Sequence, residues 1–92
     1  MISIELPKAL GLAVNGNSIV EIEESCATVG DALKALKDRA PNVVDRLVDE
    51  RGNIREHVNV FANGENIRYL QGQTTPTPDG TSILILAAIS GG

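Results

Sequence analysis

The stretch "TVGDALKALKDRA", residues 28–40, decides the fold because it predicts one long amphipathic helix in an otherwise strand-rich chain of 92 residues. Its apolar side chains recur at the spacing of a single helix face: Val29, Ala32, Leu33, Leu36 and Ala40. Thr28 and the acidic residue three places later resemble a capping box at the start of the helix, and Pro41 stops it. The sequence therefore offers one long helix to cover one sheet.

Two strands are predicted before this helix. In residues 2–6, apolar and polar side chains alternate, which is typical of a strand with one buried face. Residues 18–23, "SIVEIE", predict a second strand, and the turn signal "NGN" at residues 15–17 lies between the two. Residues 1–23 therefore read as a hairpin with a long connection.

The elements predicted after the helix are a short helical turn, a hairpin and a last strand. The helical turn over residues 43–48 is expected to end near Gly52, acting as its C-terminal cap. The remaining elements are a strand at 57–62, an Asn63-Gly64 turn, a short strand at 66–69, a loop at 71–80 and a strand at 82–87.

This order of elements predicts an α+β fold of the β-grasp, or ubiquitin-like, type. One helix cannot cover both faces of such a sheet, so the economical packing is a mixed sheet with one main helix across one face. We expect a single β-grasp domain over residues 1–86 and a flexible C-terminal tail over 87–92 that ends in Gly-Gly.

Composition excludes several classes of function. The net charge of −4, the scattered basic residues and the two aromatic residues argue against nucleic-acid and membrane partners. The single cysteine, Cys26, excludes an intramolecular disulfide and favours a reducing, cytoplasmic compartment. One histidine, His57, and one cysteine make no metal site, and nothing in the sequence pairs them for nucleophilic catalysis. We expect no bound cofactor and no catalytic residues.

The last strand is apolar on both faces. Ile83 and Ile85 share one face, and Leu84 and Leu86 share the other. A strand covered on one side should alternate with polar residues. Either neighbouring side chains cover the Leu84 and Leu86 face, or that face meets a partner.

The chain closes with "AAISGG", residues 87–92. Because glycine has no Cβ, Gly91 and Gly92 would let the terminal carboxyl carbon enter a slot that admits only backbone. A carboxylate is inert to nucleophiles, so another enzyme would have to activate it, and acyl-adenylate formation with ATP is the obvious route. The alternative is a frayed terminus of no significance.

The run "HVNVFANGENIRYLQGQTTPTPDGTSILILAAISGG", residues 57–92, resembles the ubiquitin-like sulfur-carrier family. That family includes the small subunit of molybdopterin synthase, the thiamine sulfur carrier and the sulfur carrier of a cysteine-synthesis pathway. The resemblance implies a carrier protein rather than an enzyme. An E1-like adenylyltransferase would use ATP to adenylate Gly92, a persulfide or another sulfur source would convert it to a thiocarboxylate, and Gly91 would give access to the active sites of partners.

The sequence leaves two alternatives for the molecule that accepts the sulfur. The extended hairpin "VNVFANGENIRYLQG" favours cysteine or related sulfur-amino-acid synthesis, in which the resemblance implies a pyridoxal-phosphate-dependent synthase and a metal-dependent peptidase as partners. The alternative acceptor is the large subunit of molybdopterin synthase. Two other classes compete with a sulfur carrier, namely a ubiquitin-like protein modifier and a plain β-grasp interaction module. In each case Leu84 and Leu86 are the inferred partner surface.

Overall fold

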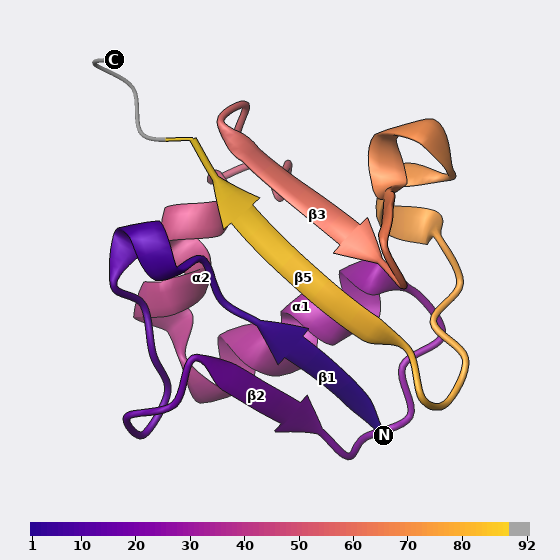
Figure 1. Cartoon of the computed structure of the whole chain (residues 1–92), viewed down its shortest axis with the longest axis horizontal. Helices are drawn as coiled ribbons and strands as arrows, with labels where there is room; N and C mark the ends of the chain where they lie inside the picture. The colour runs from indigo at the N-terminus through magenta and orange to yellow at the C-terminus, as the bar shows by residue number, and fades with distance from the viewer. Residues whose placement is uncertain (89–92) are drawn as a thin grey trace.

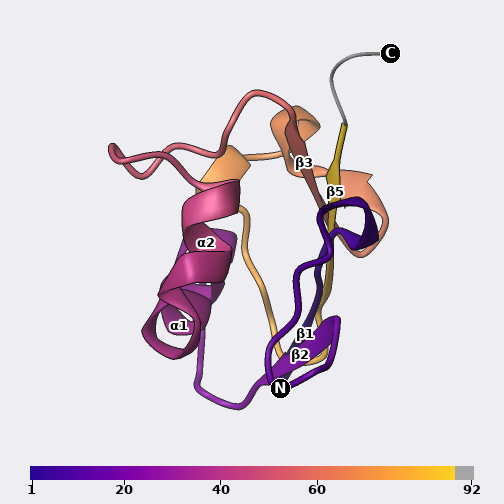
Figure 2. The same ribbon diagram turned by 90° about the vertical axis from the view of Figure 1, so that its left-hand side faces the viewer.

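A computed structural model describes residues 1–88 of the chain as one five-stranded mixed sheet packed against two helices. The strands are β1 (Ile2–Glu5), β2 (Ile19–Ile22), β3 (Val58–Ala62), β4 (Glu65–Asn66) and β5 (Ser82–Ala87), in the spatial order β2-β1-β5-β3-β4. Both helices lie on the same side of the sheet, as the two views show (Figure 1, Figure 2). This is the predicted β-grasp arrangement.

The main helix, α1 (Val29–Arg39), begins and ends where its sequence predicts. The Thr28 hydroxyl accepts a hydrogen bond from the backbone N–H of Asp31 at 3.2 Å and so caps the first turn. Pro41 stops α1 and also starts the next helix, α2 (Pro41–Leu47). Proline fits the first turn of a helix because the backbone N–H that it lacks would have no intrahelical acceptor there. The apolar faces of both helices are buried in a single core with the helix-facing side of the sheet.

Two local predictions are wrong. Gly52 does not cap α2, which ends at Leu47 with Val48 already extended. Instead Gly52 adopts a φ of 85° inside a separate turn, in which its N–H donates to the Asp49 carbonyl. The residues predicted as a strand at 66–69 form strand only at β4, and then a 3₁₀ turn over Ile67–Tyr69.

That 3₁₀ turn follows from a side-chain cap and a buried anchor. The Asn66 side chain accepts a hydrogen bond from the N–H of Arg68 at 2.9 Å, and Ile67 is buried beneath the turn. Two other short 3₁₀ segments, Lys8–Leu10 and Gly72–Thr74, lie in connections that the sequence predicts only as loops.

Strand β5 lies at the centre of the sheet, parallel to β1 and antiparallel to β3. Ala87 is still paired with Val58, and the N–H of Ala88 donates to the His57 carbonyl at 2.9 Å. The first two residues of the predicted tail are therefore held by the sheet, while its other four lie outside the described residues.

Candidate functional site

The side of the sheet that faces away from the helices is the candidate site, and we call it the open face. On β5 the two faces differ sharply: Ile83 and Ile85 are completely buried in the core, whereas Leu84 is half-buried and Leu86 is 46% exposed. Both leucines point to the open face because side chains alternate along a strand. Within residues 1–88 no element covers Leu86, which leaves it available to a partner.

Strand register builds a row of side chains across the open face around Leu84. Leu84 lies opposite Phe61 on β3 and opposite Glu5 on β1, and Glu5 in turn lies opposite Ile19 on β2. Leu84, Phe61 and Glu5 are half-buried and Ile19 is 55% exposed. We call these four residues the central row. It is apolar except for one carboxylate.

Polar side chains border the central row on both sides. Toward the start of β5, Glu21, Ser3 and Ser82 align in register, and the hydroxyl of Ser3 donates to that of Ser82 at 3.4 Å. On β3 and β4, the Asn66 amide donates to the Asn59 side chain at 3.3 Å. The apolar part of the open face is thus a band of limited width with a polar rim, the usual anatomy of a protein docking site.

Sequence reasoning found Leu84 and Leu86 but missed Phe61, Glu5 and Ile19. Those three residues alternate with buried neighbours, so the sequence does predict that they face away from the core. What the sequence does not reveal is the strand order, which places β1 rather than another strand beside β5. Only that order brings Glu5 next to Leu84.

The predicted sulfur-bearing and access residues, Gly92 and Gly91, lie outside the described residues. The chain leads toward them from the end of β5, beside Leu86. Ala88 at that end is tied to His57 by its backbone hydrogen bond. The segment that carries both glycines therefore begins next to the open face.

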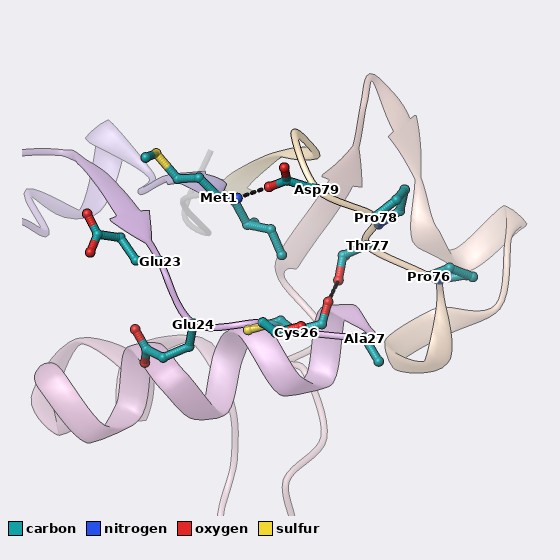
Figure 3. A pocket seen from close by; sticks show the side chains of 11 residues that line it. Met1, Glu23, Glu24, Cys26, Ala27, Pro76, Thr77, Pro78 and Asp79 are labelled. Atoms are coloured by element: carbon teal, nitrogen blue, oxygen red, sulfur yellow. Dashed lines mark hydrogen bonds and ion pairs between the residues drawn. The ribbon is translucent and has the colours of Figure 1, made fainter.

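A hollow of about 540 Å³ lies at the opposite end of the sheet, between the segment leading into α1 and the loop leading into β5 (Figure 3). Cys26 lines it and is 8% exposed, and burial, with help from the charges of Asp31 and Glu24, raises the pKa of its thiol. The Thr77 hydroxyl donates to the Cys26 carbonyl at 2.9 Å and holds the two segments together. Because the thiolate is the nucleophilic form, this raised pKa disfavours a nucleophilic role for Cys26.

The structure does not bring Cys26 and His57 together. Cys26 lies at the end of the sheet where β5 starts, and His57 lies beside the residue that follows β5. Among residues 1–88 no group of three or more histidine, cysteine or acidic side chains is placed to hold a metal ion. In the same residues, every helix is too short or too polar to cross a bilayer.

Comparison with known proteins gives this surface its context. Residues 10–92, which include both terminal glycines, match the ThiS family. The chain belongs to the ThiS family. It is accordingly a ubiquitin-like sulfur carrier, a carrier protein rather than an enzyme.

Relatives of this ThiS-family chain include proteins named as sulfur carriers and proteins named as modifiers. The sulfur carrier protein CysO of Mycobacterium tuberculosis is 28% identical over 99% of this chain and 98% of its own. The small archaeal modifier protein 3 of Haloferax volcanii is 35% identical over 72% of this chain and 71% of its own. A crystal structure of the BexX/CysO complex of Amycolatopsis orientalis contains a chain that superimposes with a TM-score of 0.85 at 28% identity, covering both chains completely.

Proposed function

We propose that this chain carries sulfur as a thiocarboxylate on the carboxyl group of Gly92. The observation that supports this most directly is the family match, which extends over residues 10–92 and so includes Gly91 and Gly92. The open face adds physical support. A carrier needs a surface that partner enzymes can hold while its last residue enters an active site.

The chemistry begins with activation of the carboxylate. One carboxylate oxygen of Gly92 attacks the α-phosphorus of ATP in an E1-like adenylyltransferase, and pyrophosphate leaves. A hydrosulfide equivalent then attacks the acyl carbon, the bond to AMP breaks, and a thiocarboxylate and AMP result. No side chain of this domain takes part in either step. Partner enzymes bind the domain through Leu86 and the central row. Gly91, which has no side chain, lets the end of the chain pass through a narrow channel.

The acceptor that we propose is an amino-acid precursor of cysteine or a related sulfur amino acid. The relative that supports this is CysO, which matches the chain over nearly its full length. The thiocarboxylate sulfur bonds to the precursor, which leaves the product joined to Gly92 through an acyl bond. Hydrolysis of that bond by water frees the product and returns Gly92 to a carboxylate, so one carrier serves many turnovers. A pyridoxal-phosphate-dependent synthase is then the expected accepting partner, with a metal-dependent peptidase to release the product. The large subunit of molybdopterin synthase is the alternative acceptor.

The test is the intact mass of the protein purified without reductant from its own host. We expect a species in which one oxygen is replaced by sulfur, located by fragmentation to the C-terminal peptide. Deletion of Gly91 and Gly92 should abolish it. The matched control is a chain with one alanine added after Gly92, which keeps both glycines but moves the free carboxyl group, and this chain should also lack the sulfur. A sulfur atom located elsewhere in the chain would overturn the proposal.

Protein modification is the second candidate, and the match to the archaeal modifier protein supports it. The same adenylate would then be attacked by a lysine amine of a target protein, with AMP leaving and an isopeptide bond forming. The two candidates differ in a simple readout. A ladder of conjugates that disappears when Gly92 is deleted supports the modifier, and a thiocarboxylate without conjugates supports the sulfur carrier.

A further inference from the structure

A small cavity lies on the side of the domain opposite to the open face, where α1 and α2 pack together (Figure 2). Its volume is about 150 Å³, and its floor is formed by the apolar side chains of Leu33, Val44 and Val48. Its rim is polar and is formed by Lys34, Lys37 and Gln73. We call the space between these six residues the lysine cavity. An apolar cavity of about this volume accepts a benzene ring, so one leucine or phenylalanine side chain of a partner would fit.

Gln73 fixes the shape of the lysine cavity. Its side-chain amide donates a hydrogen bond to the Gly52 carbonyl at 2.8 Å, and so joins the 3₁₀ segment Gly72–Thr74 to the turn that follows α2. Its backbone carbonyl lies so close to Gly30 of α1 that a Cβ on Gly30 would approach the carbonyl oxygen to 3.3 Å. The cavity is therefore formed before any partner binds, which lowers the conformational entropy lost on binding.

The lysine cavity is cationic in a chain whose net charge is −4. Lys34 and Lys37 are two of the three lysines of the chain, and both are exposed. The two ion pairs of residues 1–88 join the N-terminal ammonium to Asp79 and Arg39 to Glu24, so neither lysine is paired there. Among the same residues no acidic side chain lines the cavity. An acidic segment of a partner would therefore meet two unpaired ammonium groups beside an apolar anchor site.

The excess of positive charge is confined to this cavity. A larger hollow of about 560 Å³ adjoins it and carries charges of both signs, from Asp45, Asp49, Glu50, Arg51 and Arg55. Some of these groups already have partners, because the Asp49 carboxylate accepts hydrogen bonds from the backbone N–H groups of Arg51 and Asn53. The hollow thus gives a docked partner a polar margin, while the preference for an acidic segment comes from the lysine cavity.

The order of the chemical steps indicates which partner needs this side of the domain. In the proposed function, the hydrosulfide equivalent attacks the Gly92 adenylate while the activating enzyme still holds the open face, because a released adenylate would be hydrolysed by water. A protein that supplies this sulfur therefore meets a carrier whose open face is covered. The lysine cavity lies on the opposite side of the sheet, where a second protein can bind at the same time (Figure 2).

We infer that the lysine cavity docks the protein that supplies the sulfur, and that this donor presents an acidic segment with one leucine-sized apolar side chain. The apolar side chain fills the cavity, and the carboxylates beside it pair with Lys34 and Lys37. The inference rests on the proposed function and adds to it a second docking surface, on the helix side of the sheet.

The experiment compares sulfur loading in the host with loading from inorganic sulfide. Lys34→Glu and Lys37→Glu each replace the chromosomal copy, and intact mass gives the fraction of the protein that carries a thiocarboxylate. In parallel, each purified variant is given sodium sulfide, ATP and the purified activating enzyme of the same organism, so that no donor protein is needed. The matched control is Arg46→Glu, which changes the charge equally. Arg46 is exposed in the last turn of α2, as Lys37 is in α1, and it does not line the cavity.

In the host we expect both lysine variants to lower the thiocarboxylated fraction at least roughly fivefold, because an acidic donor is repelled. Lys37→Arg keeps the positive charge and should stay within about twofold of wild type, as should Arg46→Glu. With sodium sulfide, all variants should reach the wild-type yield within about twofold, since the open face and Gly92 are unchanged. For the same reason, the KM for the carrier in ATP–pyrophosphate exchange should stay within about twofold of wild type.

Four other results would overturn the inference. If Lys34→Glu and Lys37→Glu carry as much sulfur in the host as Arg46→Glu does, the inference is wrong and the proposed function stands. If both are also loaded poorly from sodium sulfide, the lysines serve the activating enzyme rather than a donor. If sedimentation shows that wild type is a dimer and that Lys37→Glu dissociates it, the occupant is a second copy. If wild type carries no thiocarboxylate from either sulfur source, the proposed function fails and takes the inference with it.

Discussion

Replacing Leu86 with alanine separates the contribution of β5 to folding from its contribution to docking. Leu86 and Ile85 are sequence neighbours on opposite faces of one strand, and their exposures are 46% and 0%. The change Leu86→Ala removes side-chain atoms that are half in water. The matched change Ile85→Ala removes atoms from the centre of the core.

The magnitudes follow from these exposures. Leucine exceeds alanine by three carbon atoms, and burying each contributes about 0.8 kcal/mol, so complete burial would contribute about 2.4 kcal/mol. Because about half of the Leu86 side chain is already buried in the free domain, Leu86→Ala should lower the free energy of unfolding by about 1 kcal/mol. The other half becomes buried only on docking, so the Kd for a partner should rise about fivefold.

Urea denaturation and partner binding, each measured on both variants, check this reasoning. Ile85→Ala should lower the free energy of unfolding by about 2–5 kcal/mol, because it leaves a cavity. Leu86→Ala should lower Tm by only about 4–8 °C. If Leu86→Ala destabilises the domain as much as Ile85→Ala does, Leu86 is a core residue and the open face is not open. An unchanged Kd would show instead that partners dock elsewhere.

Two further predictions concern the hollow beside Cys26. Thr77→Val should lower the free energy of unfolding by about 1–3 kcal/mol in urea titrations, because the buried Cys26 carbonyl loses its hydrogen-bond donor. Thr77→Ser keeps the hydroxyl and should lower the free energy of unfolding by less. Equal losses for the two variants would contradict the role of this hydrogen bond. Because burial raises the pKa of the Cys26 thiol, iodoacetamide at pH 8 should alkylate it more slowly in the folded protein than in urea. The alkylation rate of the folded protein should rise as pH increases. Equal rates in the two states would show that the thiol is as accessible and as ionised in the folded protein as in urea.

The parts of the fold that the sequence predicts are those with local causes. The Thr28 cap and Pro41 lie within one turn of the helix ends that they determine, and the Asn63-Gly64 turn needs the positive φ angles that both residues adopt, 48° and 87°. The failures at Gly52 and at residues 66–69 have a different origin. Gly52 serves a turn of its own, and the cap from Asn66 with the burial of Ile67 overrides the strand preference of "NIRY".

The open face was predictable only in part, for a related reason. That Leu84 and Leu86 leave the core follows from alternation along one strand, which is a local property. That Glu5 and Phe61 flank Leu84 depends on which strands are neighbours in space, and this is set by the packing of the whole sheet. A docking surface assembled from several strands is therefore visible in sequence as fragments without their arrangement.

The central position of β5 has a consequence for the synthesis of this protein. Ser3 and Ser82 are 79 positions apart and yet lie side by side, so the first strand to leave the ribosome waits for the last. A chain that stops before β5 has both helices and the β1–β2 hairpin, but it lacks the strand that joins the two halves of the sheet. Two separate hairpins are barely stable in water. Without β5 the two hairpins share no sheet, so we expect a prematurely terminated chain to be a substrate for quality-control proteases rather than a decoy that occupies partner enzymes.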